Sequence, residues 1–258
     1  MLPYPNIDPV FLKIGPLEFR WYGLMYVLGL TLGFWYLKNK LKTSLKLNND
    51  LIWNLMSYIT IGVILGGRLG YVLFYNLPYY WQHPLTIFAV WEGGMSFHGG
   101  GLGCVLAILI FSLVYKTNFY LVLDFLALGS TIGIGLGRLA NFINGELYGR
   151  VTNLPWGMIF PNGGEHIRHP SQLYEAFFEG LVLFLILNFL LKKQILKPGQ
   201  LFAWFLINYG IFRFFIEFLR EPDSQIGLFF NFLSMGQLLS GLMIAGGGLF
   251  FFWRNKGH

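Results

Sequence analysis

The 258-residue sequence contains few charged residues and one cysteine. Only 12% of the residues are Asp, Glu, Lys or Arg, whereas 55% are hydrophobic and the mean hydropathy is +0.56. A soluble domain carries about 25% charged residues, so this composition excludes an ordinary soluble protein and indicates an integral membrane protein. The single Cys104 excludes an internal disulfide framework, and we expect it to pack among the apolar residues around it.

The sequence also lacks a basic stripe and a signal peptide. Its net charge is +6, but the basic residues are spread among loops and apolar segments, so we expect no nucleic acid partner. Residues 1–20 contain four prolines and two acidic residues and have no basic n-region. We therefore expect this segment to be an extramembrane tail that is retained in the mature chain.

The long apolar runs predict an all-α fold with about seven transmembrane helices in one polytopic domain, residues 1–258. The expected spans are approximately residues 21–37, 51–74, 95–115, 120–139, 172–191, 199–219 and 235–253. The longest loop, residues 141–171, is rich in turn-forming residues and is predicted to form a small cap. Glycines at every fourth position predict close helix packing in the second and fourth spans. These are Gly62, Gly66 and Gly70, and Gly129, Gly133 and Gly137.

The distribution of basic residues predicts the orientation of the chain. Alternate loops and tails place ten Lys and Arg residues on one side and five on the other. Because basic residues near span ends stay in the cytoplasm, we expect the N-terminus outside and the C-terminus in the cytoplasm. This orientation makes the cap, and any site beside it, extracytoplasmic.

The most informative stretch is residues 137–149, GRLANFINGELYG, at the end of the fourth span. It places Arg138, Asn141, Asn144 and Glu146 where an apolar helix ends. An arginine at the end of a lipid-buried segment is energetically costly and is expected to face a polar cavity and a partner. We therefore expect a functional site here.

The sixth span carries a second polar group. Tyr209, Arg213, Glu217 and Arg220 follow one another at intervals of four, four and three, so they share one helix face. A self-neutralised Arg213–Glu217 pair that only fixes packing is the structural alternative. Several arginines around one cavity suit a phosphate, and a membrane protein meets phosphate most readily in a phospholipid headgroup.

Two acidic residues and a glycine-rich stretch are further candidates for functional positions. Glu175 and Glu179 are four residues apart, which predicts that both face the interior, without indicating a role. The stretch GGMSFHGGG, residues 93–101, contains His98, which is a candidate general base or, alternatively, an interfacial histidine bonded to the backbone. A serine hydrolase using Ser96 is disfavoured, because no nucleophile-elbow pattern is present.

A further histidine pair lies in the long loop. His166 and His169 are spaced H-x-x-H, but the loop lacks the spacing of known zinc motifs, so we expect no metal. We also expect no cofactor.

Residues 137–149 resemble the signature of bacterial prolipoprotein diacylglyceryl transferases. The resemblance covers nearly the whole chain, through RWYGLMY (20–26), GGRLGY (66–71), GGMSFHGG (93–100), RHPSQLYE (168–175), YGIFR (209–213) and EFLREPD (217–223). It implies a seven-span enzyme of the bacterial cytoplasmic (inner) membrane. Such an enzyme transfers the diacylglyceryl group of phosphatidylglycerol to the lipobox cysteine thiol of a preprolipoprotein signal peptide. Glycerol 1-phosphate is released in this first step of lipoprotein maturation.

By position, the resemblance also implies functional roles for Tyr22 and Gly149. Together with the residues named above, we expect catalytic roles for His98, Arg138, Arg213, Glu146, Tyr209 and Glu217, and substrate binding by Tyr22, Arg68, Asn141, Asn144, Gly149 and Arg220. The arginines suit stabilisation of the departing phosphate. A thiol with a pKa near 8.5 needs a base, for which His98 is the candidate and Glu146 or Glu217 the alternatives.

Two other classes of protein fit part of the pattern. A transporter or flippase would bind an anion at a broken helix, but its two halves would resemble each other, and the signature occurs once. A non-catalytic lipid-binding scaffold would need the arginines but not a base.

Overall fold

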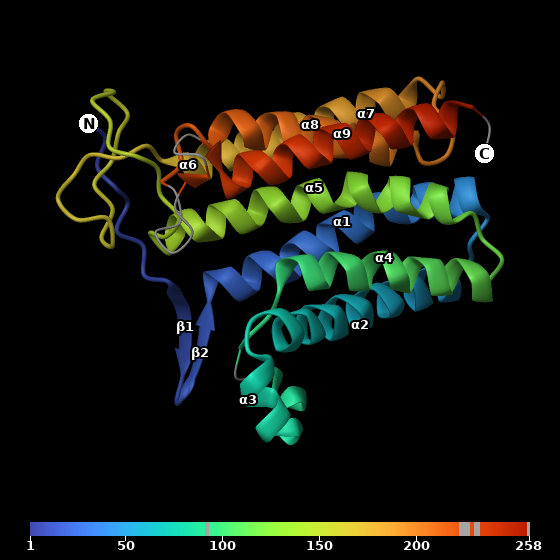
Figure 1. Cartoon of the computed structure of the whole chain (residues 1–258), viewed down its shortest axis with the longest axis horizontal. Helices are drawn as coiled ribbons and strands as arrows, with labels where there is room; N and C mark the ends of the chain where they lie inside the picture. Colours follow the sequence, from blue (N-terminus) through green and yellow to red (C-terminus); the bar gives the residue numbers. More distant parts are fainter. Residues whose placement is uncertain (91–92, 222–227, 230–232, 257–258) are drawn as a thin grey trace. The chain divides into compact units, whose positions relative to one another are not determined.

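The computed structural model describes residues 1–90, 93–221, 228–229 and 233–256, and its elements are mainly helices (Figure 1). The chain forms two compact units. The first unit consists of Met1–Leu37 and Asp124–His258, and the second of Lys38–Leu123.

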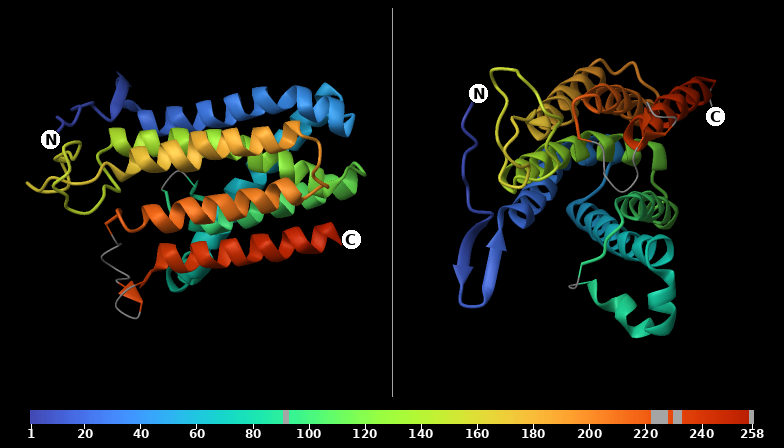
Figure 2. Two further views of the ribbon diagram at one scale, coloured as in Figure 1. Left: turned by 90° about the horizontal axis from the view of Figure 1, so that it is seen from above. Right: turned by 60° about the vertical axis from the view of Figure 1, so that its left-hand side comes forward.

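The first unit begins with a β-hairpin within the predicted tail. Strand β1 (Val10–Ile14) pairs antiparallel with β2 (Leu17–Arg20), and Gly15, with φ +59°, lies in the turn. The remaining elements are α1 (Trp21–Leu45), α5 (Phe119–Ile143), α6 (Ser171–Glu175), the π-helix η3 (Ala176–Val182), α7 (Leu183–Lys192), α8 (Gln200–Ile216), the paired strands β3 (Leu228–Phe229) and β4 (Leu233–Ser234), and α9 (Met235–Asn255). Helices α8 and α9 run side by side (Figures 1 and 2). The division between the units falls within α1 and α5.

The second unit is built on two helices that pack through glycines. It contains α2 (Asn49–Phe74), α3 (Leu77–Gln82), the 3-10 helix η1 (Pro84–Phe88) and α4 (Phe97–Val114). A Cβ added to Gly70 would lie 2.8 Å from the Cα of Gly99, and one added to Gly103 would lie 2.9 Å from the Cα of Gly66. Only glycine allows so close an approach, so the glycine spacing predicted for the second span is confirmed.

Helix α5 packs on α1 through part of the predicted glycine face. A Cβ on Gly29 would lie 2.8 Å from the Cα of Gly133, and one on Gly33 would lie 3.0 Å from the carbonyl oxygen of Gly129. The prediction is wrong for Gly137, where an added Cβ would meet no atom of the described residues within 4 Å. Helical rotation turns that position away from α1, because the glycine face follows a period of four rather than 3.6 residues.

In the first unit, polar contacts join the start of α5, the start of α8 and the end of α9. The buried carboxylate of Asp124 on α5 accepts the backbone N–H groups of Gly199 (2.6 Å) and Phe202 (2.7 Å), and thereby caps α8. The Nε of Arg254 on α9 donates to the carbonyl oxygen of Pro198 (2.8 Å). Three helices distant in sequence are therefore joined here.

The surface identifies a multi-pass helical membrane protein. Large apolar side chains such as Trp35, Leu113 and Leu249 are exposed along the helices, the reverse of a soluble protein. In the part of the chain that the structure describes, four helical segments are long and apolar enough to cross a membrane, namely Asn49–Phe74, Phe119–Ile143, Ser171–Lys192 and Met235–Asn255. Helices lie at all seven positions where the sequence predicts a span.

Candidate functional site

Six charged side chains of the first unit form one ionic cluster at the end of α5 and α8. The ionic cluster consists of Arg138, Glu175, Glu179, Arg213, Glu217 and Arg220. It gathers three guanidinium groups around three carboxylates, and the side chains of Glu175 and Glu179 have no exposed surface. Buried charges persist only when they are paired in this way.

Glu175 is the centre of the ionic cluster. One carboxylate oxygen, Oε2, lies 3.2 Å from the Nε of Arg138, and the other, Oε1, accepts from the Nη1 of Arg220 at 3.1 Å and from the Nη1 of Arg213. Three arginines from two segments therefore converge on one glutamate. This arrangement fixes the guanidinium planes, which is what recognition of a planar or tetrahedral oxyanion requires.

Glu179 and Glu217 are held less symmetrically. The carboxylate of Glu217 lies 2.8 Å from the Nη2 of Arg213. That of Glu179 lies 3.6 Å from the Nη2 of Arg138 and 3.8 Å from the Nη1 of Arg213, and neither of its oxygens accepts a hydrogen bond from a residue that the structure describes. The Arg213–Glu217 ion pair is therefore present. Because Arg213 also pairs with Glu175 and Glu179, the pair is not an isolated, self-neutralised contact that only fixes packing.

Close backbone contact brings Arg138 to the two glutamates. A Cβ added to Gly180 would lie 2.6 Å from the Cα of Gly135, so α5 touches η3 one turn before Arg138. The glutamates precede and occupy η3, where the wider π-helical turn changes the rotation between neighbouring side chains. Such π-helical segments often occur at functional sites, and here Glu175, just before the segment, and Glu179, within it, both pair with Arg138.

Arg220 reaches the ionic cluster by a route that helical spacing did not predict. Helix α8 ends at Ile216, so Arg220 lies beyond it and the expected common helix face extends only to Glu217. Arg220 is placed by a β-bridge to Gly149. A Cβ on Gly149 would lie 2.6 Å from the Cβ of His169, so glycine is required there for packing. The predicted role of Gly149 in substrate binding stays a prediction.

The end of α5 carries a second polar group beside the ionic cluster. Glu146 Oε1 accepts from the Nδ2 atoms of Asn141 (2.8 Å) and Asn144 (3.1 Å), and its backbone carbonyl accepts from the side chain of Gln172 (2.6 Å). Among the described residues Glu146 forms no ion pair, so amides and not arginines orient it. The Tyr22 hydroxyl lies within electrostatic range of both Glu146 and Arg138.

Tyr209 completes the predicted set on α8. It is half-buried and lies within electrostatic range of Arg138, Arg213, Glu175 and Glu179. The structure therefore brings together nearly all of the predicted residues that belong to the first unit.

Residues 144–170 fold over this end of α5. Phe142, Met158 and Phe160 form a small core, and the Tyr4 hydroxyl donates to the carbonyl oxygen of Phe142 (2.7 Å). Burial raises the pKa of the Tyr4 phenol and lowers the pKa of the His169 imidazole. The segment is thus an ordered structure and not an open loop.

Two predicted residues, Arg68 and His98, belong to the second unit. The buried guanidinium of Arg68 donates to the carbonyl oxygens of Ile87 (2.8 Å), Gly93 (2.5 Å) and Thr86 (2.6 Å). Its visible role is to hold the segment that leads into α4, and its predicted role in substrate binding stays a prediction. His98 is exposed in the first turn of α4.

Ser96 caps the same helix. Its hydroxyl oxygen accepts the backbone N–H of Gly99 (3.2 Å). A serine that serves as an N-cap in this way is explained without a nucleophilic role.

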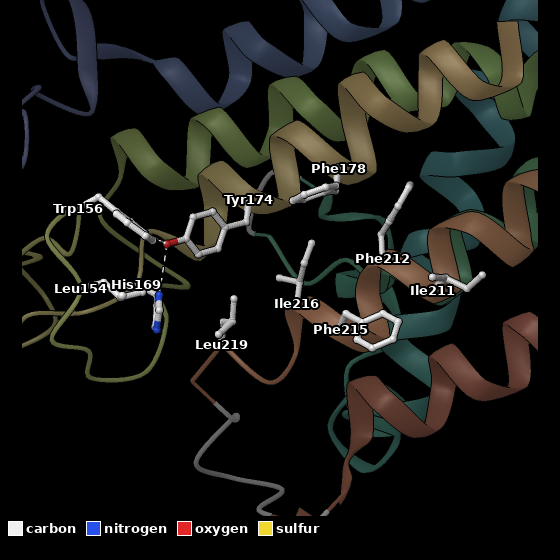
Figure 3. Close-up of a pocket in the computed structure, with 10 residues that line it drawn as sticks. All are labelled: Leu154, Trp156, His169, Tyr174, Phe178, Ile211, Phe212, Phe215, Ile216 and Leu219. Carbon is white, nitrogen blue, oxygen red and sulfur yellow. Dashed lines mark hydrogen bonds between the residues drawn. The ribbon is translucent and has the colours of Figure 1, made fainter. Parts of the chain in front are cut away.

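An apolar pocket of about 570 Å³ lies on the same two helical segments as the ionic cluster (Figure 3). It is lined by Leu154, Trp156, His169, Tyr174, Phe178, Ile211, Phe212, Phe215, Ile216 and Leu219. Figure 3 shows the Tyr174 hydroxyl near Trp156, whose Nε1 donates to it (2.8 Å), and near the Nδ1 of His169 (3.3 Å). Tyr174 and Phe212 each precede a member of the ionic cluster in the sequence, but the lining includes no member of the cluster, so the two features share helices without sharing residues.

The sequence predicted interior positions for Glu175 and Glu179 but gave them no role. Their four-residue spacing signalled a shared face, yet only the fold shows that they pair with arginines on two other helices. Sequence separation conceals such partners: Arg213 and Glu175 are 38 residues apart.

Comparisons with known proteins show the family of the chain. The family model of prolipoprotein diacylglyceryl transferase matches residues 9–253. A phosphatidylglycerol–prolipoprotein diacylglyceryl transferase of Geobacter sulfurreducens is 54% identical over 241 residues, which cover 93% of this chain and 92% of that protein. Proteins of the same name from Pseudoalteromonas translucida and Vibrio vulnificus are each 50% identical; the matches cover 99% and 100% of this chain, and 96% and 95% of theirs. The chain therefore belongs to the prolipoprotein diacylglyceryl transferase family.

Proposed function

We propose that this protein transfers the diacylglyceryl group of phosphatidylglycerol to the lipobox cysteine thiol of preprolipoproteins and releases glycerol 1-phosphate. The observation that carries the proposal is the convergence of Arg138, Arg213 and Arg220 on Glu175. An apolar pocket lies on the same helical segments. A phospholipid joins a phosphate to apolar chains, so it matches both features of the site.

The reaction displaces a phosphate ester from carbon, so the departing phosphate gains negative charge. Preorganised donors aimed at that charge lower the barrier. The two ion pairs of Arg138 use Nε and Nη2, which leaves Nη1, among the contacts of the described residues, to donate to a phosphate oxygen. Its side chain is 19% exposed, so it is accessible while largely shielded from water. Arg213 stabilises the same charge from α8.

The attacking thiol must lose its proton. His98 is the proposed base, since Glu217 is paired with Arg213 at 2.8 Å and a paired carboxylate is a weaker base. Glu146 is the alternative, because amides and not cations hold its carboxylate. Tyr209 is proposed to act beside the arginines.

Substrate binding is assigned to the remaining predicted residues, Tyr22, Arg68, Asn141, Asn144, Gly149 and Arg220. For Asn141 and Asn144 the contacts with Glu146 support this role, because they hold both amides at the carboxylate of another predicted site residue.

The proposed setting is the bacterial inner membrane, with seven spans, the N-terminus outside, the C-terminus in the cytoplasm and residues 141–171 as an extracytoplasmic cap. The surplus of basic residues on the opposite side supports this orientation. The bond from Tyr4 to Phe142 also supports it, because the N-terminal segment then lies at the same end of the first unit as the cap. The chain is proposed to work as one polytopic domain.

Mass spectrometry tests the function directly. A lipobox peptide is incubated with purified protein and phosphatidylglycerol, alongside the His98→Ala variant. The wild type is expected to add one diacylglyceryl mass to the cysteine, and the variant to bind lipid without transfer. If folded, lipid-binding wild type gave no mass gain, a scaffold or transporter would replace the transferase.

A further inference from the structure

The ionic cluster is formally neutral before any substrate binds. Its three guanidinium groups balance its three carboxylates, and its arginine side chains are only 10–19% exposed. A phosphodiester anion that enters this site leaves one negative charge without a partner. Because a buried unpaired charge is strongly unfavourable, binding must bring a compensating positive charge with it.

The three carboxylates are not equally able to accept a proton. Glu175 accepts hydrogen bonds from Arg213 and Arg220, and Glu217 lies 2.8 Å from an Arg213 nitrogen. Hydrogen bonds from cations hold Glu175 in its ionised form, and the close ion pair does the same for Glu217, whose Oε2 accepts no hydrogen bond from the described residues. Glu179 accepts none from the described residues, and its two arginine neighbours lie at 3.6 and 3.8 Å. Protonation of Glu179 therefore breaks no hydrogen bond.

The surroundings of Glu179 make it the group that a bound anion affects most. It faces Arg138 on α5, Arg213 and Tyr209 on α8, Arg220 beyond α8, and Glu175 within the same helical segment. A phosphate bound by Arg138 and Arg213 competes for the two cations nearest to Glu179. Glu175 would still keep Arg220 at 3.1 Å.

We propose that Glu179 takes up one proton when the phosphodiester of phosphatidylglycerol binds at Arg138 and Arg213. The inference rests on the proposed function and adds a charge-balancing residue to the same site. Glu179 acts through the arginines and is thus a positioning residue. Uptake of one proton on binding means that affinity falls about tenfold per pH unit over the pH range in which Glu179 is ionised in the free protein and protonated in the complex.

Calorimetry measures this proton directly. Short-chain phosphatidylglycerol is titrated into the purified full-length chain in detergent, in two buffers of different ionisation enthalpy, so that the difference in heat gives the protons taken up. At a pH at which Glu179 is ionised in the free protein, the wild type is expected to take up close to one proton per lipid. Glu179→Gln should take up none and bind with an affinity independent of pH. The matched control is Glu165→Gln, the same change at an exposed position, which should behave as the wild type.

Three results would overturn the inference: lipid binding by the wild type without proton uptake, proton uptake by Glu179→Gln equal to that of the wild type, or proton uptake lost in Glu165→Gln as well. If Glu179→Gln does not fold, the slope of wild-type affinity with pH decides the matter, and a flat profile refutes the proposal.

The transfer assay on the same preparations separates this inference from the function on which it rests. Transfer without proton uptake would refute the role of Glu179 and leave the transferase intact. Lipid binding with proton uptake but without transfer would refute the transferase activity. The proposed protonation of Glu179 on anion binding would then still stand.

Discussion

Replacement of Gly180 by alanine tests whether the contact between α5 and η3 positions the ionic cluster. The new Cβ would lie 2.6 Å from the Cα of Gly135. Carbon atoms pack best at about 3.5–4.0 Å, so the two segments must separate by about 1 Å. The Arg138–Glu179 distance, now 3.6 Å, would then exceed ion-pair range. We expect the overpacking to cost about 1–3 kcal/mol and the transfer rate to fall about 100-fold, as for other misplacements of this size.

The matched control for this variant is Gly241→Ala in α9, where an added Cβ would lie more than 4 Å from every neighbouring atom that the structure describes. Both variants gain about 1 kcal/mol of intrinsic helix propensity, so their difference isolates the steric effect. Thermal unfolding in detergent and the rate of peptide lipidation are measured on the same preparations. A Gly180→Ala protein with the stability and rate of Gly241→Ala would refute the positioning argument. A loss of stability at a normal rate per folded molecule would refute its link to the ionic cluster.

Three further predictions concern other parts of the first unit. Asp124→Ala removes the acceptor for the N–H groups of Gly199 and Phe202, and thermal unfolding should show a loss of about 0.5–2 kcal/mol with transfer preserved; unchanged stability would contradict the capping role. Arg213→Lys keeps the charge but loses the planar fork, so we expect transfer to fall about 10- to 100-fold; near-normal rates would remove that argument. Burial lowers the pKa of His169 from 6.5, so the unfolded state binds the proton first. Stability should therefore fall as the pH drops below about 6.5 and level off below the folded pKa. Unfolding temperatures at about pH 7.5 and 5.5 should differ more for the wild type than for His169→Gln, and equal differences would oppose this view.

The sequence by itself determined the features that depend on local chemistry. Runs of about 20 apolar residues must form helices in lipid, because the backbone has no other hydrogen-bond partners there, and helices lie at each expected position. An arginine in an apolar segment is energetically costly, so Arg138 indicated the position of the site. The spacing of Tyr209, Arg213 and Glu217 placed them together along α8 and its C-cap, because helical periodicity is a property of neighbouring residues.

Only the tertiary structure decided which charges meet. Glu175 pairs with arginines 37, 38 and 45 residues away, and no local pattern encodes such partners. Arg220 joins them after α8 has ended, through a bridge to Gly149. The contact of Gly135 with Gly180 and the π-helical turn set how close the groups come. These distances depend on packing between segments distant in sequence, so the partners of each charge follow from the fold and not from the order of residues.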